Sequence, residues 1–419
     1  MLRPCVCFFV ATLLLTSGEI QADDQVKTPA WPQFRGPHRD DVSAEKGLLT
    51  EWPKEGPAVV WKTAGMGGGF SSVAVAGGKI FTLGNKDNKT YVRAVDQASG
   101  KLLWSAPVGG AGGNLGCTPT VDGERVYAIG QDGDLVCVLT ASGEVVWRKS
   151  FLKDFQGECG GWRYTESPLV DGAALVCTPG AKDALMVAFD KTSGEVLWKC
   201  PSPFDEATAG YSSIVVATVG NHRVYVQLTA GGVVGVEAKS GKLLWHYDKL
   251  GNNTANIPTP IILGNLIFCS AGYGKGGALL EQSVQGDGVK VSERYFKPEL
   301  TNKHGGLVVV GDYVYGDRDD SGMPFCAEVK SGKVIWRRKS RGQGRGSAAV
   351  TYADGRLYFR YDNGVMALVP ATPTEYTETG TFKIPNAETQ SWAHPVVADG
   401  KLYLREQDIL WCYDVKRMP

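Results

Sequence analysis

The sequence predicts an all-β fold, an eight-bladed β-propeller of four-stranded antiparallel blades. The first observation is a repeated segment that ends in tryptophan, of which DQASGKLLW (96–104) and EAKSGKLLW (237–245) are two copies. The second is the spacing of the closing tryptophans, which recurs every 43 to 51 residues between Trp61 and Trp245. The third is the series of short β-branched runs and turn residues inside each copy. Repeats of this length, made of strands and turns, are typical of propeller blades.

Each copy has the pattern of four strands joined by tight turns. In CTPTVDGERVYAIGQDGDLVCVLTASGEVVW (117–147), strand-forming runs alternate with DG, QDG and ASG turn signals. Two copies are degenerate: one ends at Tyr295 or Phe296 in place of Trp, and another ends near Phe382. The last copy supplies only three strands, whereas GPAVVWKT (56–63) is a strand without a copy of its own. Joining this N-terminal strand to the C-terminal blade closes a ring of eight.

Composition agrees with a single propeller domain over 56–419. The chain of 419 residues has 54 glycines and no long helical period, and each blade of a propeller packs only on its neighbours. Lys plus Arg and Asp plus Glu number 44 each, so no global field favours nucleic acid or an anionic membrane. We therefore expect no nucleic-acid partner, and we expect a monomer.

The N-terminus has the pattern of a secretory signal. Arg3 precedes an apolar stretch from about Cys5 to Leu15, and a small-residue exit follows at Gln21 and Ala22. We expect a signal peptide over 1–22, cleavage near Ala22, export to the periplasm or cell envelope, and an N-terminal extension over 23–55. An uncleaved membrane anchor is the alternative, although the apolar run is short for one, and no later segment is long and apolar enough to span a bilayer.

Eight cysteines follow the predicted signal, and an even number in an oxidising compartment favours disulfides. Several of them instead share one position, six residues before the turn glycine, where all copies carry small residues. The residues at that position are Ala94, Cys137, Ala188, Gly235, Cys326 and Cys412. These cysteines are expected to act as compact core residues. Cys117, Cys159 and Cys200 lie outside this register, and a Cys117 to Cys159 bridge is left open.

Another aligned position marks the entry to the innermost strand of each blade. Its eight residues are Ser72, Thr118, Ser167, Ser213, Thr259, Gly306, Ser347 and His394. Six are hydroxyl residues, which favours a structural role in bonding backbone groups at the mouth of the channel; His394 is the departure.

The residues near this position differ most between copies, and the loops that carry them are expected to share one face. The candidate binding residues are Arg163, Tyr164, Glu166, Tyr211, Asn256, Lys303, His304, Arg345, Trp392 and His394, with Trp162 beside Arg163 in GGWRYTESP. Cations, aromatic rings and a titratable base suit a planar, polar or anionic ligand. The alternative is that polar and aromatic side chains only fill an irregular loop-lined mouth.

Two charged loops have open interpretations. RRKSRGQGRG (337–346) holds five basic residues and is either a clamp for carboxylates, phosphates or an acidic partner, or a solvated loop. GDRDDSG (316–322) holds Asp317, Asp319 and Asp320, whose carboxylates are candidate ligands for Ca²⁺, although the loop lacks the full EF-hand pattern.

The SG(K/E)xxW signature, the Ser-Pro and His-Pro strand openings and the eightfold ring resemble the pyrroloquinoline-quinone (PQQ) repeat family. That family includes quinoprotein alcohol dehydrogenases and the outer-membrane assembly lipoprotein BamB. The leader WPQFRGPHRDDVSAEKGLLTEWP (31–53) resembles the opening of exported members from planctomycete-type bacteria. The resemblance implies that the repeat tryptophans dock between blades as a structural girdle. They are Trp61, Trp104, Trp147, Trp198, Trp245 and Trp336.

The resemblance also implies what an enzyme of this family requires. A quinoprotein dehydrogenase holds PQQ between a Trp floor and a disulfide of adjacent cysteines, with Ca²⁺ on carboxylate and amide ligands. This chain has no Cys-Cys pair and no CxxCH haem motif. We therefore predict an exported, non-catalytic scaffold that binds a partner protein or peptide on its loop face and uses no cofactor. BamB-like assembly work is one version, although BamB's lipid-attachment cysteine is lacking. The alternatives are a PQQ- and Ca²⁺-dependent alcohol or sugar dehydrogenase, or a binder of a small quinone or carbohydrate.

Overall fold

The structure is a computed structural model that describes residue 1 and residues 31–113, 115–340, 342–388 and 390–417. The predicted signal peptide from residue 2 on, with its cleavage near Ala22, lies outside the described residues. None of the helices in the described part of the chain is long and apolar enough to cross a membrane.

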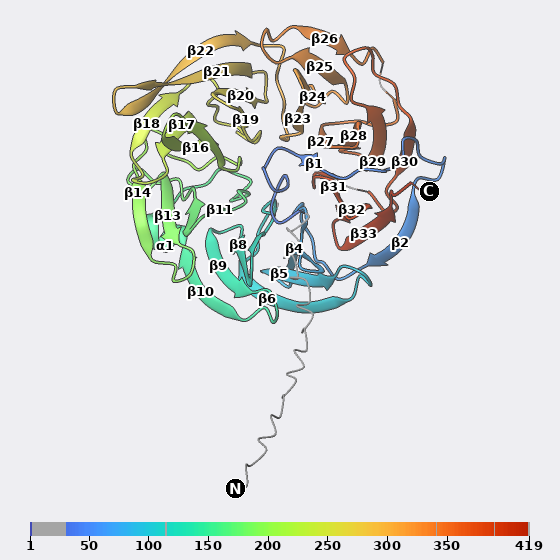
Figure 1. The fold of residues 1–419 in the computed structure, drawn as a ribbon, viewed down its shortest axis with the longest axis horizontal. Helices are drawn as coiled ribbons and strands as arrows, with labels where there is room; N and C mark the ends of the chain where they lie inside the picture. Colours follow the sequence, from blue (N-terminus) through green and yellow to red (C-terminus); the bar gives the residue numbers. More distant parts are fainter. Residues whose placement is uncertain (2–30, 114, 341, 389, 418–419) are drawn as a thin grey trace.

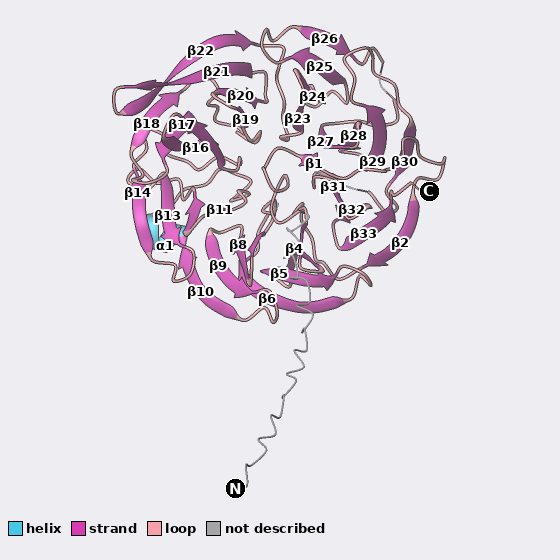
Figure 2. Ribbon diagram, viewed as in Figure 1, coloured by secondary structure: helices cyan, strands magenta, loops and turns pink. Residues whose placement is uncertain are grey.

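Eight sheets stand around a central axis like the blades of a propeller, with almost no helix (Figures 1 and 2). In blades 1 to 7 the four repeat strands run in sequence order from the centre outward, and in blade 8 the outermost strand comes from the N-terminal part of the chain. Blades 1 and 2 contain β3 (Ala74–Ala76), β4 (Lys79–Lys86), β5 (Lys89–Asp96), β6 (Leu102–Gly110), β7 (Thr120–Asp122), β8 (Arg125–Ile129), β9 (Asp134–Leu139) and β10 (Val145–Ser150). Blades 3 and 4 contain β11 (Leu169–Asp171), β12 (Ala174–Cys177), β13 (Met186–Asp190), β14 (Val196–Cys200), β15 (Val215–Val219), β16 (His222–Thr229), β17 (Gly232–Glu237) and β18 (Leu243–Tyr247).

The second half of the ring repeats the plan. Blades 5 and 6 contain β19 (Ile261–Leu263), β20 (Leu266–Ala271), β21 (Gly276–Gln285), β22 (Gly288–Lys297), β23 (Leu307–Val310), β24 (Tyr313–Asp317), β25 (Pro324–Glu328) and β26 (Val334–Arg337). Blades 7 and 8 contain β27 (Ala348–Ala353), β28 (Arg356–Tyr361), β29 (Val365–Pro370), β30 (Gly380–Lys383), β31 (Val396–Ala398), β32 (Lys401–Glu406) and β33 (Ile409–Asp414). A short helix, α1 (Phe151–Phe155), follows β10.

The predicted closure of the ring is confirmed. The N-terminal strand β2 (Ala58–Thr63) pairs antiparallel with β33 and becomes the outermost strand of blade 8, so that Trp61 lies opposite Cys412. The all-β class and the count of eight four-stranded blades are confirmed as well. Two ends of the chain that lie about 350 residues apart in sequence thus complete one sheet.

The repeat tryptophans link neighbouring blades. The indole N–H of Trp104 on β6 donates to the carbonyl of Thr140 in the last turn of blade 2 at 3.0 Å. Trp61, Trp147, Trp198 and Trp336 make the same bond to the following blade at 3.0 to 3.2 Å, and Trp245 uses the side-chain oxygen of Gln282. In the degenerate blade 5, the residue at the Trp register is Tyr295, whose hydroxyl donates to Val329 O at 2.6 Å.

The pairing explains the row of small residues that includes Cys137. Each of them lies directly opposite the repeat Trp of its own blade: Cys137 opposite Trp147, and Cys326 opposite Trp336. At Gly235 an added Cβ would lie only 2.1 Å from the ring of Trp245. The indole therefore occupies the space that a larger side chain on the facing strand would need.

The N-terminal extension crosses the centre of the ring. Its strand β1 (Val42–Ser43) pairs in parallel with β27, the innermost strand of blade 7, and makes that sheet five-stranded (Figure 1). Trp31, which is 1% exposed, bridges to Val75 in blade 1. Residues 31–43, which we call the plug, therefore contact the innermost strands of blades 1 and 7 and lie inside a channel that the repeats alone would leave open.

Candidate functional site: an aromatic cup above the plug

The hydroxyl residues at the strand entries form a belt around part of the channel. Ser72 N donates to Thr118 Oγ1 at 3.1 Å, and Thr118 N donates to Ser167 Oγ at 2.9 Å. The series continues from Ser167 to Ser213 and from Ser213 to Thr259, at 3.0 and 3.2 Å. Four of these hydroxyls, those of Thr118, Ser167, Ser213 and Thr259, thus accept from a buried amide of the preceding blade, which is the structural role that the alignment predicted.

Two buried arginines hold the plug across the channel. Arg39 donates to Ser167 O at 3.1 Å, to Ile214 O at 3.0 Å and to Pro168 O in blades 3 and 4. Arg35 donates to Gly305 O and Leu307 O in blade 6, at 2.9 Å each. Burial lowers the pKa of Arg39 to about 10, which leaves its guanidinium charged at neutral pH.

The plug separates two cavities at different depths. Above it, a cavity of about 190 Å³ is lined by residues at the strand entries, such as Thr165 and Ile257, and by Phe34 of the plug. Below it, a second cavity is lined by residues further along the innermost strands, such as Asp171 and Ile262. We call the upper cavity the cup. It is closed at the bottom and opens on the loop-bearing face, and it is much larger than the roughly 10 to 15 Å³ that one water needs.

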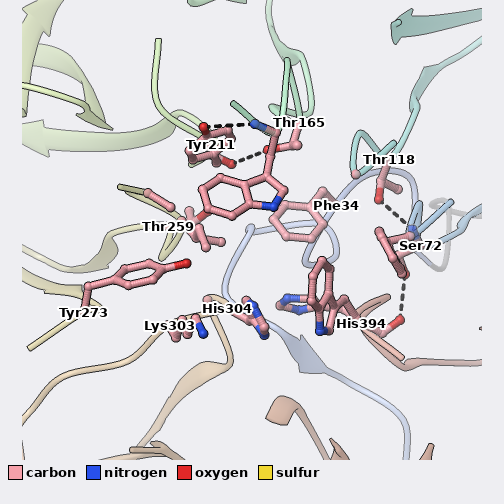
Figure 3. A pocket seen from close by; sticks show the side chains of 17 residues that line it. Phe34, Ser72, Thr118, Thr165, Tyr211, Thr259, Tyr273, Lys303, His304 and His394 are labelled. Atoms are coloured by element: carbon pink, nitrogen blue, oxygen red, sulfur yellow. Dashed lines mark hydrogen bonds between the residues drawn. The ribbon is translucent and has the colours of Figure 1, made fainter. Parts of the chain in front are cut away.

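Aromatic rings from several blades and from the plug line the cup (Figure 3). Trp392 packs on Phe70 at 4.6 Å between ring centroids and on His304 at 4.7 Å. Trp162 packs edge to face on Tyr211 at 5.9 Å. The lining residues are Phe34, Phe70, Ser72, Gly116, Thr118, Trp162, Thr165, Tyr211, Ala255, Ile257, Thr259, Tyr273, Lys303, His304, Gly305, Trp392 and His394. Such a cavity suits a flat apolar ring.

Two polar side chains of the cup, Lys303 and His304, differ in their partners. Lys303 forms an ion pair with Asp320, and its ammonium lies 5.0 Å from the ring centroid of Tyr273. Burial lowers the pKa of His304 to about 4, so this imidazole is neutral at pH 7. Its Nδ1 is buried and bonds no described residue.

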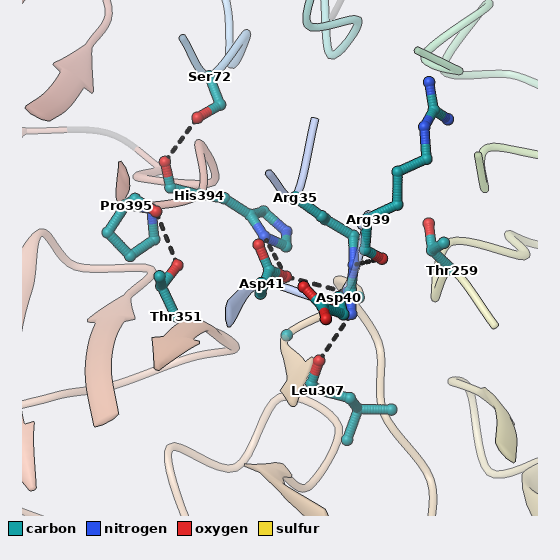
Figure 4. Close-up of polar contacts among 12 residues, drawn as sticks. Arg35, Arg39, Asp40, Asp41, Ser72, Thr259, Leu307, Thr351, His394 and Pro395 are labelled. Atoms are coloured by element: carbon teal, nitrogen blue, oxygen red, sulfur yellow. Dashed lines mark hydrogen bonds and ion pairs between the residues drawn. The ribbon is translucent and has the colours of Figure 1, made fainter. Parts of the chain in front are cut away.

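His394 is the most constrained polar group at the floor of the cup. Its Nδ1 lies 3.2 Å from Oδ2 of Asp41, a fully buried carboxylate of the plug (Figure 4). The same carboxylate forms an ion pair with Arg35 at 3.0 Å. The ring of His394 also packs edge to face on Phe34 at 4.9 Å. The plug therefore both closes the cup and fixes the imidazole beside it.

Five of the ten candidate binding residues line the cup. They are Tyr211, Lys303, His304, Trp392 and His394. They come from blades 4, 6 and 8, so the fold brings together side chains that are up to 183 residues apart in sequence.

The structure places the other five candidates outside the cup. Arg163 is exposed and forms an ion pair with Asp132 at 3.7 Å. Arg345 is exposed in the basic loop. Tyr164 is buried, and its hydroxyl donates to a backbone carbonyl. Glu166 is buried and accepts two hydrogen bonds from Thr178. Asn256 is buried and bonds within its own loop.

The three candidate calcium ligands, Asp317, Asp319 and Asp320, have separate partners in the structure. Asp319 accepts backbone amides of Tyr273 and Gly274 in the neighbouring blade, whereas Asp320 pairs with Lys303 and accepts from Ser347. Burial raises the pKa of Asp317 well above its usual value, which favours a neutral carboxyl. The three carboxyl groups thus face different partners, and the described residues contain no group of three or more metal-ligating side chains suited to an ion.

The cysteines beyond the predicted signal are free thiols in the described part of the chain. Cys117, Cys137 and Cys200 are buried, and Cys159 is partly buried. The Cys117 to Cys159 pairing that the sequence left open is not formed in the structure.

A fixed offset in the repeat would have identified the wall of the cup. The residues two positions before the belt position are Phe70, Gly116, Thr165, Tyr211, Ile257, His304, Arg345 and Trp392. All except Arg345 line the cavity. Phe34 and Tyr273 were missed as well: Phe34 lies in the extension, which has no counterpart in the repeats, and Tyr273 lies in a loop between the second and third strands of blade 5.

Comparisons with known proteins agree with this architecture. A sequence model described as outer membrane protein assembly factor BamB matches residues 88–338, more than half of the chain. BamB of Shewanella oneidensis is 25% identical over 260 residues, which cover 57% of this chain and 61% of that protein, so the chain spans less than two thirds of this relative.

Two solved structures share the fold at low identity. BamB from Moraxella catarrhalis has a TM-score of 0.61 and 12% identity, over 86% of this chain and 98% of that one. Quinohemoprotein alcohol dehydrogenase from Comamonas testosteroni has a TM-score of 0.64 and 13% identity, over 94% and 81%. The resemblance to the PQQ repeat family is thus confirmed, and the chain belongs to the PQQ-repeat family described as outer membrane protein assembly factor BamB.

Proposed function

We propose that the chain is a binding module of the cell envelope that captures a partner protein or an extended peptide on the face that carries the cup. The match to a family described as an outer-membrane assembly factor supports both the scaffold role and the envelope location. The fold supports it too, because propellers present clustered loops on one face of a rigid ring.

The observation that carries the proposal is the exposure of aromatic side chains at the cup. Trp162 is 36% exposed and Tyr273 is 38% exposed. Among the described residues, these are the only aromatic members of the exposed large hydrophobic side chains, and both line the cup. Aromatic residues around a pocket are typical of the energetic centre of a protein interface.

The closed floor determines from which side a ligand reaches the cup. Since the plug blocks the channel, a bound group enters and leaves the cup from the loop-bearing side only. A side chain of a partner that is inserted from that side would bury its apolar surface against Trp162 and Trp392, while the rest of the partner contacts the surrounding loops. A cup above a plug is therefore suited to anchoring a protein segment.

The test is capture of envelope proteins by the full chain and by variants of the rim. Trp162→Ala and Tyr273→Ala should each weaken capture at least tenfold, because an anchor residue at an interface typically contributes 2 kcal/mol or more. Leu197→Ala is the matched control, since Leu197 is 52% exposed but lies on the outer strand β14. Equal capture by all three variants, with unchanged melting temperatures, would refute the proposal.

A quinoprotein dehydrogenase is the second candidate, and the aromatic walls are the observation that favours it. A flat quinone would find aromatic rings to stack on in Trp162 and Trp392, but the acidic groups near the cup do not fit a calcium ion. Asp41 is engaged by Arg35 and His394, and Asp320 is engaged by Lys303 and Ser347.

A titration with PQQ and Ca²⁺, in the presence of simple alcohols and an artificial electron acceptor, separates the two candidates. Saturable uptake of PQQ with reduction of the dye would favour the enzyme and contradict the scaffold. No uptake, together with capture that depends on Trp162, is the result that we expect.

A further inference from the structure

Nε2 of His394 is a free hydrogen-bonding position at the floor of the cup. The other ring nitrogen, Nδ1, is held by Asp41 at 3.2 Å. Figure 4 shows the ring nitrogen that does not face Asp41 pointing away from that carboxylate. Nε2 bonds no group in the described part of the chain, and it is absent from the buried polar atoms that lack a partner, so it is accessible from the cup.

The plug determines which tautomer the neutral imidazole adopts. Oδ2 of Asp41 is buried and accepts from the guanidinium of Arg35 at 3.0 Å, so it serves as an acceptor toward His394 as well. The proton of a neutral His394 ring therefore lies on Nδ1, between the ring and Asp41. Nε2 then carries a lone pair that faces the cup and accepts a hydrogen bond from a ligand.

The surroundings of this lone pair select the ligand further. Phe34 packs against the His394 ring at 4.9 Å, and Trp392 stands above the floor against His304 at 4.7 Å. A flat ring can pack against these aromatic side chains. The cup does not favour a cationic ligand, because none of the described residues that line it is a carboxylate and Lys303 already lies over the face of Tyr273 at 5.0 Å.

We propose that the cup binds a phenol, with its ring between the aromatic walls and its hydroxyl donating to Nε2 of His394. Asp41 is then a positioning residue, because it acts on the ligand only through the imidazole that it orients. The inference deepens the proposed function, on which it rests, since a tyrosine side chain of a partner is one source of the phenol. A free phenolic compound is the other source, with the same chemistry in the cup.

Binding of p-cresol and toluene to the full chain tests this directly, because the two probes differ in the hydroxyl group alone. Ligand-observed NMR titrations should give p-cresol an affinity about tenfold higher than toluene, the ratio expected for one hydrogen bond between neutral groups. 4-Methylanisole, whose ether oxygen cannot donate, should bind no better than toluene. Equal affinity for p-cresol and toluene would overturn the proposal, whatever the variants do.

Two variants locate the interaction. His394→Phe keeps an aromatic ring at the floor but removes the acceptor, so the preference for p-cresol over toluene should disappear. Asp41→Asn keeps the size of the side chain but no longer fixes the proton on Nδ1, so the preference should fall several-fold while toluene binding stays. His222→Ala is the matched control: this histidine pairs with Glu237 at 3.6 Å on β16 and does not line the cup. An unchanged preference in His394→Phe would also overturn the proposal.

Peptides distinguish the two sources of the phenol. A short unstructured peptide that contains tyrosine should compete with p-cresol, and its phenylalanine counterpart should compete about tenfold less well. If neither peptide competes with p-cresol, the cup binds free phenols and does not accept a tyrosine side chain. The outcomes also separate this inference from the proposed function. Capture that depends on Trp162, without any preference for p-cresol over toluene, retains the scaffold and refutes the phenol site. A preference for p-cresol, without capture that depends on Trp162, retains the phenol site and refutes the scaffold.

Discussion

Trp104 and Gly143 are in direct contact across the junction between blades 1 and 2. A Cβ added to Gly143 would lie 2.6 Å from Cε3 of Trp104, and the indole N–H donates to Thr140 in the same turn. The relation recurs between Trp61 and Gly100, between Trp147 and Gly194, between Trp198 and Gly241, and between Tyr295 and Gly332. The repeated turn therefore needs glycine for two reasons: its φ is positive, and the aromatic ring of the preceding blade occupies the space that a Cβ would need.

Gly143→Ala should lower the free energy of unfolding by about 2 to 4 kcal/mol. Part of this is strain, because Gly143 has a φ of 75°, which costs an alanine of order 1 kcal/mol. The rest is overpacking against Trp104, typically 1 to 3 kcal/mol. Gly123→Ala is the matched control, since Gly123 also has a positive φ, 56°, but an added Cβ meets nothing within 4 Å. Urea unfolding of the two variants measures the difference, and equal losses would contradict the contact.

Cys137→Leu should destabilise the protein by about 1 to 3 kcal/mol, because it overpacks the space opposite Trp147. Cys137 is fully buried, and its facing residue in the sheet is the indole that links blades 2 and 3. Cys137→Ala, which removes only the sulfur, should cost less. The melting temperatures of the two variants check this order, and a Leu variant as stable as the parent would refute it.

The repeats made the fold predictable, and the parts without a repeat were not. The recurring Trp gave the blade count and the closure by β2, because each copy repeats one packing solution. The aligned entry positions gave the belt and led to Tyr211, His304 and Trp392. The plug could not be found in this way, since Arg35 and Arg39 bond backbone carbonyls that no side-chain pattern marks.

The same limit explains the misplaced candidates. Tyr164 and Glu166 belong to the variable loop that was expected to face the ligand, but neighbouring residues of an irregular loop point in different directions. Trp162 lines the cup, whereas Tyr164 turns inward to Pro179 O. Side-chain direction in such a loop depends on its backbone path, which composition and spacing do not specify.

Arg39→Met should destabilise the protein by about 3 to 5 kcal/mol, because it removes a charged donor from three buried carbonyls of blades 3 and 4, of which Pro168 O keeps the hydroxyl of Thr120. Arg39→Lys should recover part of this, since one ammonium cannot reproduce the fork of a guanidinium. Thermal melting measures the loss. Limited proteolysis should show the bonds near Arg39 cut first in the Met variant, and a plug as resistant as in the parent would contradict its anchoring by this residue.

Glu166 should make the stability of the protein fall as the pH rises. Burial raises the pKa of its carboxyl to about 7 in the folded protein, against a usual value of 4.5, and the hydrogen bonds from Thr178 and the charge of Arg39 only partly offset this. The folded state therefore holds the proton more tightly than the unfolded state. Below about pH 4.5 this preference contributes fully to stability, and between about 4.5 and 7 the contribution is lost.

Glu166→Gln removes this titration while it keeps an acceptor for the amide of Thr178. The free energy of unfolding of the parent minus that of the variant should thus decrease by about 3 kcal/mol between pH 4.5 and pH 8, at 1.36 kcal/mol per pKa unit. Urea unfolding at these two pH values measures it. The control is Glu195→Gln, because Glu195 is exposed in the last turn of the same blade and should give no such change. If the difference in free energy of unfolding between the parent and Glu166→Gln does not change with pH, this carboxyl ionises in the folded protein as it does in water.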